Sequence, residues 1–127
     1  MNTRKIAIIG GGNLGIAMAE GLLKSGFTKA GDLTVTRRTL AHLQSLKAQG
    51  VTITDNNQKA IESSEVIIVA LKPYNVREVL EGLKNSFDPS RHIVISVVTG
   101  VSLMDLSAII GSKIPLFRAM PNTAIAI

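Results

Sequence analysis

A glycine pattern near the amino terminus constrains the fold of this chain more than any other feature. Gly10, Gly12 and Gly15 form G-x-G-x-x-G between an apolar run at residues 5–9 and a stretch with helical spacing at residues 13–25. In that setting the first glycine permits a tight turn, the second lets a pyrophosphate approach the backbone, and the third lets the helix pack close to the strand. Free N–H groups at the start of the helix would attract the phosphates. The pattern therefore predicts a phosphate-binding loop, and the alternative is a turn that only joins two elements.

Strand-like and helix-like segments alternate along the rest of the chain. Apolar runs predict further strands at residues 32–36, 51–54, 66–71, 92–98 and 115–118, and helical spacing predicts helices at residues 40–49, 57–63, 75–83 and 103–110. Alternation with short links is typical of a parallel sheet that is covered on both faces. Right-handed crossovers then favour a doubly wound arrangement. We expect one α/β domain over residues 1–127, a doubly wound parallel sheet (Rossmann-type) of about six strands with helices on both faces.

Two arginines follow the second predicted strand. An NAD site usually has Asp or Glu about 20 residues after the glycine pattern, where it binds the ribose 2′-hydroxyl. Near that position this chain has Thr36-Arg37-Arg38-Thr39 and no acid. Arginine forms charge-assisted and often bidentate contacts with phosphate. The sequence therefore predicts NADP(H) as the preferred cofactor, with NAD(H) as the alternative, unless the arginines are only the exposed first turn of a helix.

Three further motifs follow predicted strands: ALKP at residues 70–73, VVTG at residues 97–100 and RAMPNTA at residues 118–124. Each has a simpler explanation, because the prolines and Gly100 can end strands, Lys72 can be solvated, and Asn122 or Thr123 can cap a helix. The carboxyl ends of parallel strands meet at one edge of the sheet, where ligands bind in open α/β folds. Their shared position therefore predicts one ligand site.

Composition excludes several other classes of function. The net charge is +5, but the basic residues are scattered and aromatic residues make up only 3%, which argues against a nucleic-acid partner. The chain has no cysteine, which suits a reducing compartment. The longest uncharged stretch, residues 6–19, is too short for a membrane span. His42 is expected at a helix surface and His92 at a strand entry, and the sequence identifies a partner for neither, so we expect no metal site. We also expect a cytoplasmic protein.

Taken together, the motifs resemble those of the pyrroline-5-carboxylate reductase family. The resemblance rests on IGGGNLG at residues 9–15, TRRT at 36–39, the Asn57 region of DNNQKA, ALKP at 70–73, VVTGVS at 97–102 and RAMPNTA at 118–124. It covers essentially the whole chain. Many dehydrogenases share the glycine pattern, whereas RAMPNT and the ordered combination are much more specific.

The resemblance implies a reaction and a set of cofactor-binding residues. NAD(P)H would pass a hydride to the C=N carbon of 1-pyrroline-5-carboxylate and give proline, the last step of proline synthesis. Residues 12–14 would cradle the pyrophosphate, and Arg37 and Arg38 would meet the adenosine phosphate. The cofactor-binding residues expected are Gly10, Gly12, Asn13, Leu14, Gly15, Thr36, Arg37, Arg38, Asn57, Leu71, Lys72, Pro73, Thr99 and Gly100, with Met120, Pro121 and Asn122 beside the nicotinamide and substrate.

One part of the family is expected to be absent. A C-terminal helical domain supplies the family's dimer interface, much of its substrate-carboxylate site and a hydroxyl group near the imine nitrogen. The resemblance therefore assigns no catalytic residue to this chain, which alone is expected to be inactive, and implies a homo-oligomer for the full-length protein. Two alternatives stay open: a stand-alone NADP-binding or sensor module without catalysis, and an F420-linked NADP oxidoreductase-like enzyme.

Overall fold

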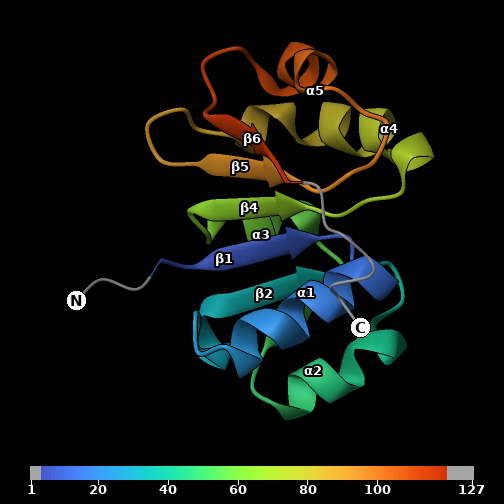
Figure 1. Ribbon diagram of the computed structural model, residues 1–127, viewed down its shortest axis with the longest axis vertical. Coiled ribbons are helices and arrows are strands. Elements are labelled where there is room, and N and C mark those ends of the chain that lie inside the picture. The colour runs from blue at the N-terminus through green and yellow to red at the C-terminus, as the bar shows by residue number, and fades with distance from the viewer. Residues whose placement is uncertain (1–3, 120–127) are drawn as a thin grey trace.

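The computed structural model describes residues 4–119, in which six parallel strands form one sheet (Figure 1). The strand order is β3-β2-β1-β4-β5-β6, so the chain crosses over after β3 and continues on the other side of β1. This is the doubly wound order of dinucleotide-binding folds, and it confirms the predicted fold class. The strands are β1 (Ile6–Ile9), β2 (Leu33–Thr36), β3 (Thr52–Thr54), β4 (Val66–Val69), β5 (Ile93–Ser96) and β6 (Leu116–Arg118).

Helices cover the sheet from both sides. In Figure 1, α1 crosses in front of the sheet and α3 lies behind it. The helices are α1 (Asn13–Lys24), α2 (Gln44–Ala48), α3 (Asn57–Glu62), α4 (Pro73–Leu83) and α5 (Leu103–Ile110), with short 3-10 turns η1 (Ala30–Asp32), η2 (Leu40–Leu43) and η3 (Lys84–Ser86). In the described part of the chain, no helix is both long and apolar enough to cross a bilayer.

Alternate residues of the strands pack into two separate hydrophobic cores, one on each face of the sheet. Ile6 and Ile8 of β1 belong to the core that also contains Leu46 of α2. Ala7 and Ile9 belong to the core on the opposite face, with residues of α3, α4 and α5. All four β1 residues are buried. A strand that is buried on both faces needs apolar side chains at every position, which explains the unbroken apolar run in the sequence.

The predicted element ends are confirmed at some helices and wrong at others. Ser102 caps α5, because its Oγ accepts a hydrogen bond of 3.0 Å from the Asp105 N–H. The single helix predicted at residues 40–49 is instead a 3-10 turn followed by the short α2, because Leu43 leaves helical backbone geometry (φ −104°, ψ 8°). Helix α4 begins at Pro73 rather than at residue 75. Proline suits the first helical position, where its missing N–H would have no partner inside the helix.

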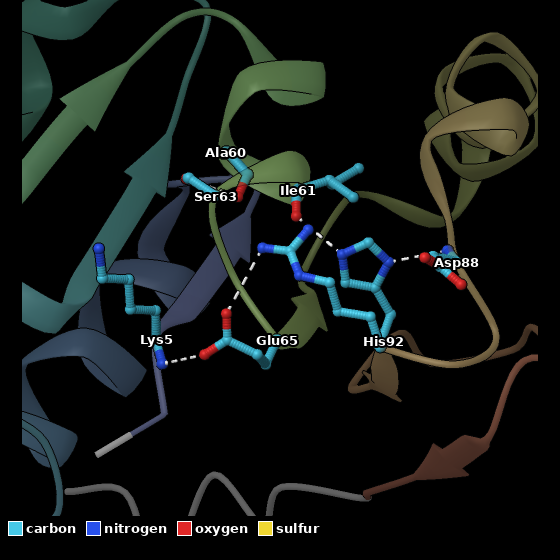
Figure 2. A network of polar contacts seen from close by, with 8 residues as sticks. Lys5, Ala60, Ile61, Ser63, Glu65, Asp88 and His92 are labelled. Atoms are coloured by element: carbon cyan, nitrogen blue, oxygen red, sulfur yellow. Dashed lines mark hydrogen bonds and ion pairs between the residues drawn. The ribbon is translucent and has the colours of Figure 1, made fainter. Parts of the chain in front are cut away.

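His92 lies at the entry to β5, as predicted, and its ring has two partners that the sequence did not identify. His92 is buried at the amino end of β5, between Asp88 and Ile61 (Figure 2). The Asp88 N–H donates to Nδ1 over 2.9 Å, and Nε2 lies 2.9 Å from the Ile61 carbonyl oxygen. A ring that accepts at Nδ1 and donates from Nε2 is neutral, with its proton on Nε2. The Phe87 ring packs against the imidazole in a T-shaped arrangement, with the two ring planes 78° apart. His92 therefore links α3 to the turn before β5.

Other polar contacts hold the same amino-terminal edge of the sheet. The Glu65 carboxylate accepts from the Lys5 N–H over 2.9 Å and lies 3.5 Å from the Arg91 guanidinium (Figure 2). In the turn before β5, the hydroxyl and the N–H of Ser90 both donate to the Asp88 carboxylate, which lowers the pKa of Asp88. These contacts are structural, because ligands of such folds bind at the opposite edge.

Replacing His92 with phenylalanine is expected to lower the free energy of unfolding by about 2 kcal/mol, because it leaves the Asp88 N–H without its partner and removes one of the two hydrogen bonds to the Ile61 carbonyl oxygen, which keeps only the bond from the Ser64 N–H. Urea denaturation measures the loss. His42→Phe is the matched control and should change stability by less than about 0.5 kcal/mol, since His42 is exposed. Equal stability of the two variants would contradict the role of His92.

Candidate functional site

The glycine loop joins β1 to α1 at the carboxyl edge of the sheet. Gly10 has a φ of +106°, and a Cβ atom there would come within 2.7 Å of the Ala70 carbonyl oxygen. A Cβ atom on Gly15 would overlap the carbonyl oxygen of Gly10. Both positions therefore require glycine, the first for the turn and the second for the close approach of α1 to the loop.

Gly12 has a different environment from the other two glycines of the pattern. A Cβ atom built there would meet no atom within 4 Å, so this residue faces open space. It precedes the first residue of α1 and supplies no side-chain cap. Within residues 4–119 its N–H donates to no other group. Helix starts leave N–H groups without partners and carry a partial positive charge, so the loop can receive an anionic group at this point.

The end of β2 holds the loop through three hydrogen bonds. The Gly11 N–H donates to the Thr36 carbonyl oxygen (2.6 Å), and the Gly10 N–H donates to Thr36 Oγ1 (3.2 Å). The third bond runs from Arg37 Nη1 to the Gly11 carbonyl oxygen (2.7 Å). Gly11 is buried, and a Cβ atom there would lie 2.9 Å from Leu43 Cδ2. The sequence pattern treats residue 11 as variable, so the close packing around this glycine was missed, although the run of three glycines could have indicated it.

A cleft of about 550 Å³ opens beside this loop. Its other walls come from the end of β2, the start of α3, and the residues after β4 that begin α4. Eight predicted site residues meet in it: Gly10, Gly12, Thr36, Arg37, Arg38, Asn57, Leu71 and Lys72. Six others do not line it: Asn13, Leu14, Gly15, Pro73, Thr99 and Gly100. Met120, Pro121 and Asn122 lie outside the described residues.

Seven lining residues were not among the predicted site residues: Gly11, Thr39, Asp55, Ala70, Tyr74, Asn75 and Val79. The first four lie inside the motifs quoted above, and the last three lie outside them. Asp55 directly follows β3, so its position at a strand end was an available signal. Tyr74, Asn75 and Val79 lie on α4. Their side chains reach the cleft only because α4 starts beside the glycine loop, and no local pattern indicates this.

The cleft carries an excess of positive charge. Arg37, Arg38 and Lys72 line it together with a single carboxylate, Asp55. Neither arginine forms an ion pair with any group of residues 4–119. Arg38 is exposed and makes no side-chain hydrogen bond in that part of the chain, whereas Arg37 is half-buried against the loop. Uncompensated guanidinium groups beside free backbone N–H groups suit a ligand with several negative charges. The described residues contain no cluster of His, Asp or Glu that could hold a metal ion.

The fold and this cleft define a dinucleotide-binding domain of the kind found in oxidoreductases. Residues 5–100 match the family model described as "NADP oxidoreductase coenzyme F420-dependent", and the chain belongs to this family.

Within that family the chain is similar to pyrroline-5-carboxylate reductases, which confirms the resemblance drawn from the motifs. It is 39% identical to pyrroline-5-carboxylate reductase 2 of Dictyostelium discoideum, over 98% of this chain and 42% of that protein. The pyrroline-5-carboxylate reductase of Pasteurella multocida is 37% identical, over 97% of this chain and 46% of that protein. The solved reductase structure from Coxiella burnetii superimposes with a TM-score of 0.88 at 33% identity, over 95% of this chain and 45% of that one. The chain thus spans less than half the length of these relatives.

Proposed function

We propose that this chain is the NADP(H)-binding domain of an oxidoreductase that reduces 1-pyrroline-5-carboxylate to proline. One observation carries the proposal: Gly12, whose N–H has no partner in residues 4–119, and Arg38, which forms no ion pair there, line the same cleft. The similarity to curated pyrroline-5-carboxylate reductases supports the choice of reaction. A solved relative from Plasmodium falciparum, described as having NADP bound, shares the fold with a TM-score of 0.84 at 24% identity.

The residues of the cleft fit such a cofactor. The N–H of Gly12 and the start of α1 would receive the diphosphate, because they combine free donors with the positive end of a helix. Asn57, Leu71 and Lys72 line the rest of the cleft and would contact the adenosine and the ribose groups. The bound NADPH would supply the hydride. The chain itself contributes placement of the cofactor and a positive field along it.

A preference for NADPH over NADH is part of the proposal. The residues after β2 are Arg37 and Arg38, and an acid that would bind a ribose 2′-hydroxyl is absent from that position. The exposed Arg38 guanidinium is available to a 2′-phosphate. Asp55, the one carboxylate of the cleft, follows β3 instead.

The remaining catalytic parts are proposed to lie in the C-terminal helical domain of the family. This domain would bind the carboxylate of the small-molecule substrate, supply the proton for the imine nitrogen and form a homo-oligomer. Residues beyond 119, including Pro121 and Asn122, would then flank the nicotinamide. A cytoplasmic location, without a nucleic-acid or membrane partner, completes the proposal.

The test separates binding from catalysis. The 127-residue chain should bind NADPH in a calorimetric titration but oxidise none of it when pyrroline-5-carboxylate is added. Hydride transfer needs the reacting carbons about 3–3.5 Å apart, and such positioning supplies roughly 7–11 kcal/mol of the barrier. The Coxiella burnetii reductase serves as the positive control. Absence of NADPH binding would overturn the cofactor assignment, and turnover near that of the control would overturn the proposed division of roles between domains.

A second candidate follows from the description of the family, which names coenzyme F420. An F420-linked enzyme would transfer a hydride between that coenzyme and NADP. We favour the reductase because relatives at 37–39% identity carry that name. A titration of the chain with F420 in the presence of NADP distinguishes the two, and saturable binding of F420 would favour the second candidate.

A further inference from the structure

Two neighbouring arginines stand at the end of β2 in different situations. Arg37 is half-buried, and its Nη1 donates to the Gly11 carbonyl oxygen over 2.7 Å. Arg38 is exposed and makes no side-chain hydrogen bond within the described part of the chain. Both line the cleft. The sequence alone gives the two residues the same role, since both follow the strand where a 2′-phosphate would bind.

The bond from Arg37 determines the direction of the donor on Gly12. The peptide bond between Gly11 and Gly12 is trans and planar, so the Gly11 C=O and the Gly12 N–H point in opposite directions. Holding the Gly11 oxygen towards Arg37 therefore turns the Gly12 N–H away from Arg37. Among the N–H groups of residues 10–12, that of Gly12 has no partner in residues 4–119, and Gly12 itself lines the cleft.

The loop needs such a restraint because it consists of consecutive glycines. Glycine populates more backbone conformations than any other residue, so residues 10–12 would otherwise lose much conformational freedom when a ligand binds. Thr36 and Arg37 hold Gly11 at both ends, through its N–H and its C=O. A donor that is already oriented binds its ligand more tightly, because the conformational entropy of the loop is lost during folding and not during binding.

We propose that Arg37 is a positioning residue for the diphosphate site, acting through the Gly11–Gly12 peptide, and that Arg38 alone discriminates NADPH from NADH. This inference rests on the proposed function, because it assumes that a dinucleotide occupies the cleft. The inference assigns different roles to Arg37 and Arg38, whereas the sequence motif implies the same role for both, binding of the 2′-phosphate.

Calorimetric titrations of three variants with NADPH and NADH test the inference. Arg37→Met removes the donor to Gly11 and should weaken both cofactors by the same factor, about tenfold. Arg37→Lys keeps a donor of similar reach and should restore NADH affinity to within about threefold of the unaltered chain. Arg38→Met is the matched control and should weaken NADPH about tenfold while leaving NADH unchanged.

The salt dependence of binding separates the proposed role from a general loss of structure. Partial unfolding would weaken both cofactors but would not change the difference in their salt dependence. In the unaltered chain, added salt should weaken NADPH more than NADH, because an exposed phosphate contact is screened. Arg37→Met should keep this difference between the cofactors, and Arg38→Met should remove it.

The outcomes separate this inference from the proposed function. If the unaltered chain binds neither cofactor, the proposed function fails. If it binds both but Arg37→Met weakens only NADPH, Arg37 is a ligand of the 2′-phosphate and the positioning role is wrong. If Arg37→Met melts at a much lower temperature, its weaker binding could reflect unfolding, and Arg37→Lys becomes the deciding variant. An Arg37→Lys protein that stays folded but binds NADH more than about threefold more weakly than the unaltered chain would contradict the inference.

Discussion

Replacing Gly12 with valine is expected to abolish measurable NADPH binding while the protein stays folded. Gly12 has extended backbone angles (φ −77°, ψ −167°), which a β-branched residue adopts without strain. A Cβ atom there meets nothing within 4 Å, so the added side chain occupies the space proposed for the diphosphate. Displacing the diphosphate would break its hydrogen bonds to the Gly12 N–H and to an N–H at the start of α1. Each charge-assisted bond is worth roughly 1.5–3 kcal/mol, so the loss of both weakens binding at least about 100-fold.

The measurement is a calorimetric titration with NADPH beside a thermal melt of the same sample. The melting temperature of Gly12→Val should stay within about 4 °C of the unaltered chain, which corresponds to about 1 kcal/mol. Gly21→Ala is the matched control, because a Cβ atom on this α1 residue also meets nothing within 4 Å but lies outside the cleft residues. Normal NADPH binding by Gly12→Val would show that the diphosphate does not lie against this residue.

Replacing Gly15 with alanine is expected to have the opposite consequence, a loss of stability. The added Cβ atom overlaps the Gly10 carbonyl oxygen, which is rigid backbone rather than the end of a flexible side chain. Helix α1 must therefore shift away from the loop. Overpacking costs roughly 1–3 kcal/mol, and we expect about 3 kcal/mol because the obstacle is backbone that also forms the turn after β1.

Urea denaturation of Gly15→Ala and Gly21→Ala compares one substitution at two positions of the same helix. Alanine is the better helix former by about 1 kcal/mol, so Gly21→Ala should raise the free energy of unfolding. Gly15→Ala should lower it despite the same gain in propensity. If both variants shift stability in the same direction, the close contact between Gly15 and the loop is not what determines the residue there.

Local patterns were sufficient to predict the elements of this fold. Strand-forming runs identified all six strands of the described sheet. The runs are wholly apolar in the central strands β1 and β4, because a strand that is buried on both faces needs apolar residues at every position. The glycine pattern identified the turn between β1 and α1, because a positive φ at Gly10 and the contact between Gly15 and Gly10 exclude other residues. The φ angle of Gly10 and its contact with Gly15 involve residues that are close in the chain, so a short sequence pattern is sufficient to predict them.

Local patterns failed where partners come from distant parts of the chain. His92 bonds to Ile61, 31 residues away, and neither neighbourhood carries a pattern that predicts the contact. The break between η2 and α2 is similar, since a helix was predicted from the spacing of Leu40, Leu43 and Leu46 alone. Leu43 and Leu46 are both buried as expected, but Leu43 also packs against the glycine loop. Packing across the fold thus overrode local periodicity.

By itself the sequence determined that this chain forms a doubly wound sheet with a phosphate-binding loop and two arginines beside it, since these follow from spacing and backbone sterics. The tertiary structure decided what each arginine does. Arg37 bonds to Gly11, 26 residues earlier in the chain, whereas Arg38 is exposed and lines the cleft without a side-chain hydrogen bond in the described residues. Both arginines follow the end of β2, and Arg38 lies in a bend, so only the packing of this segment against the glycine loop determines which guanidinium is bound and which is free.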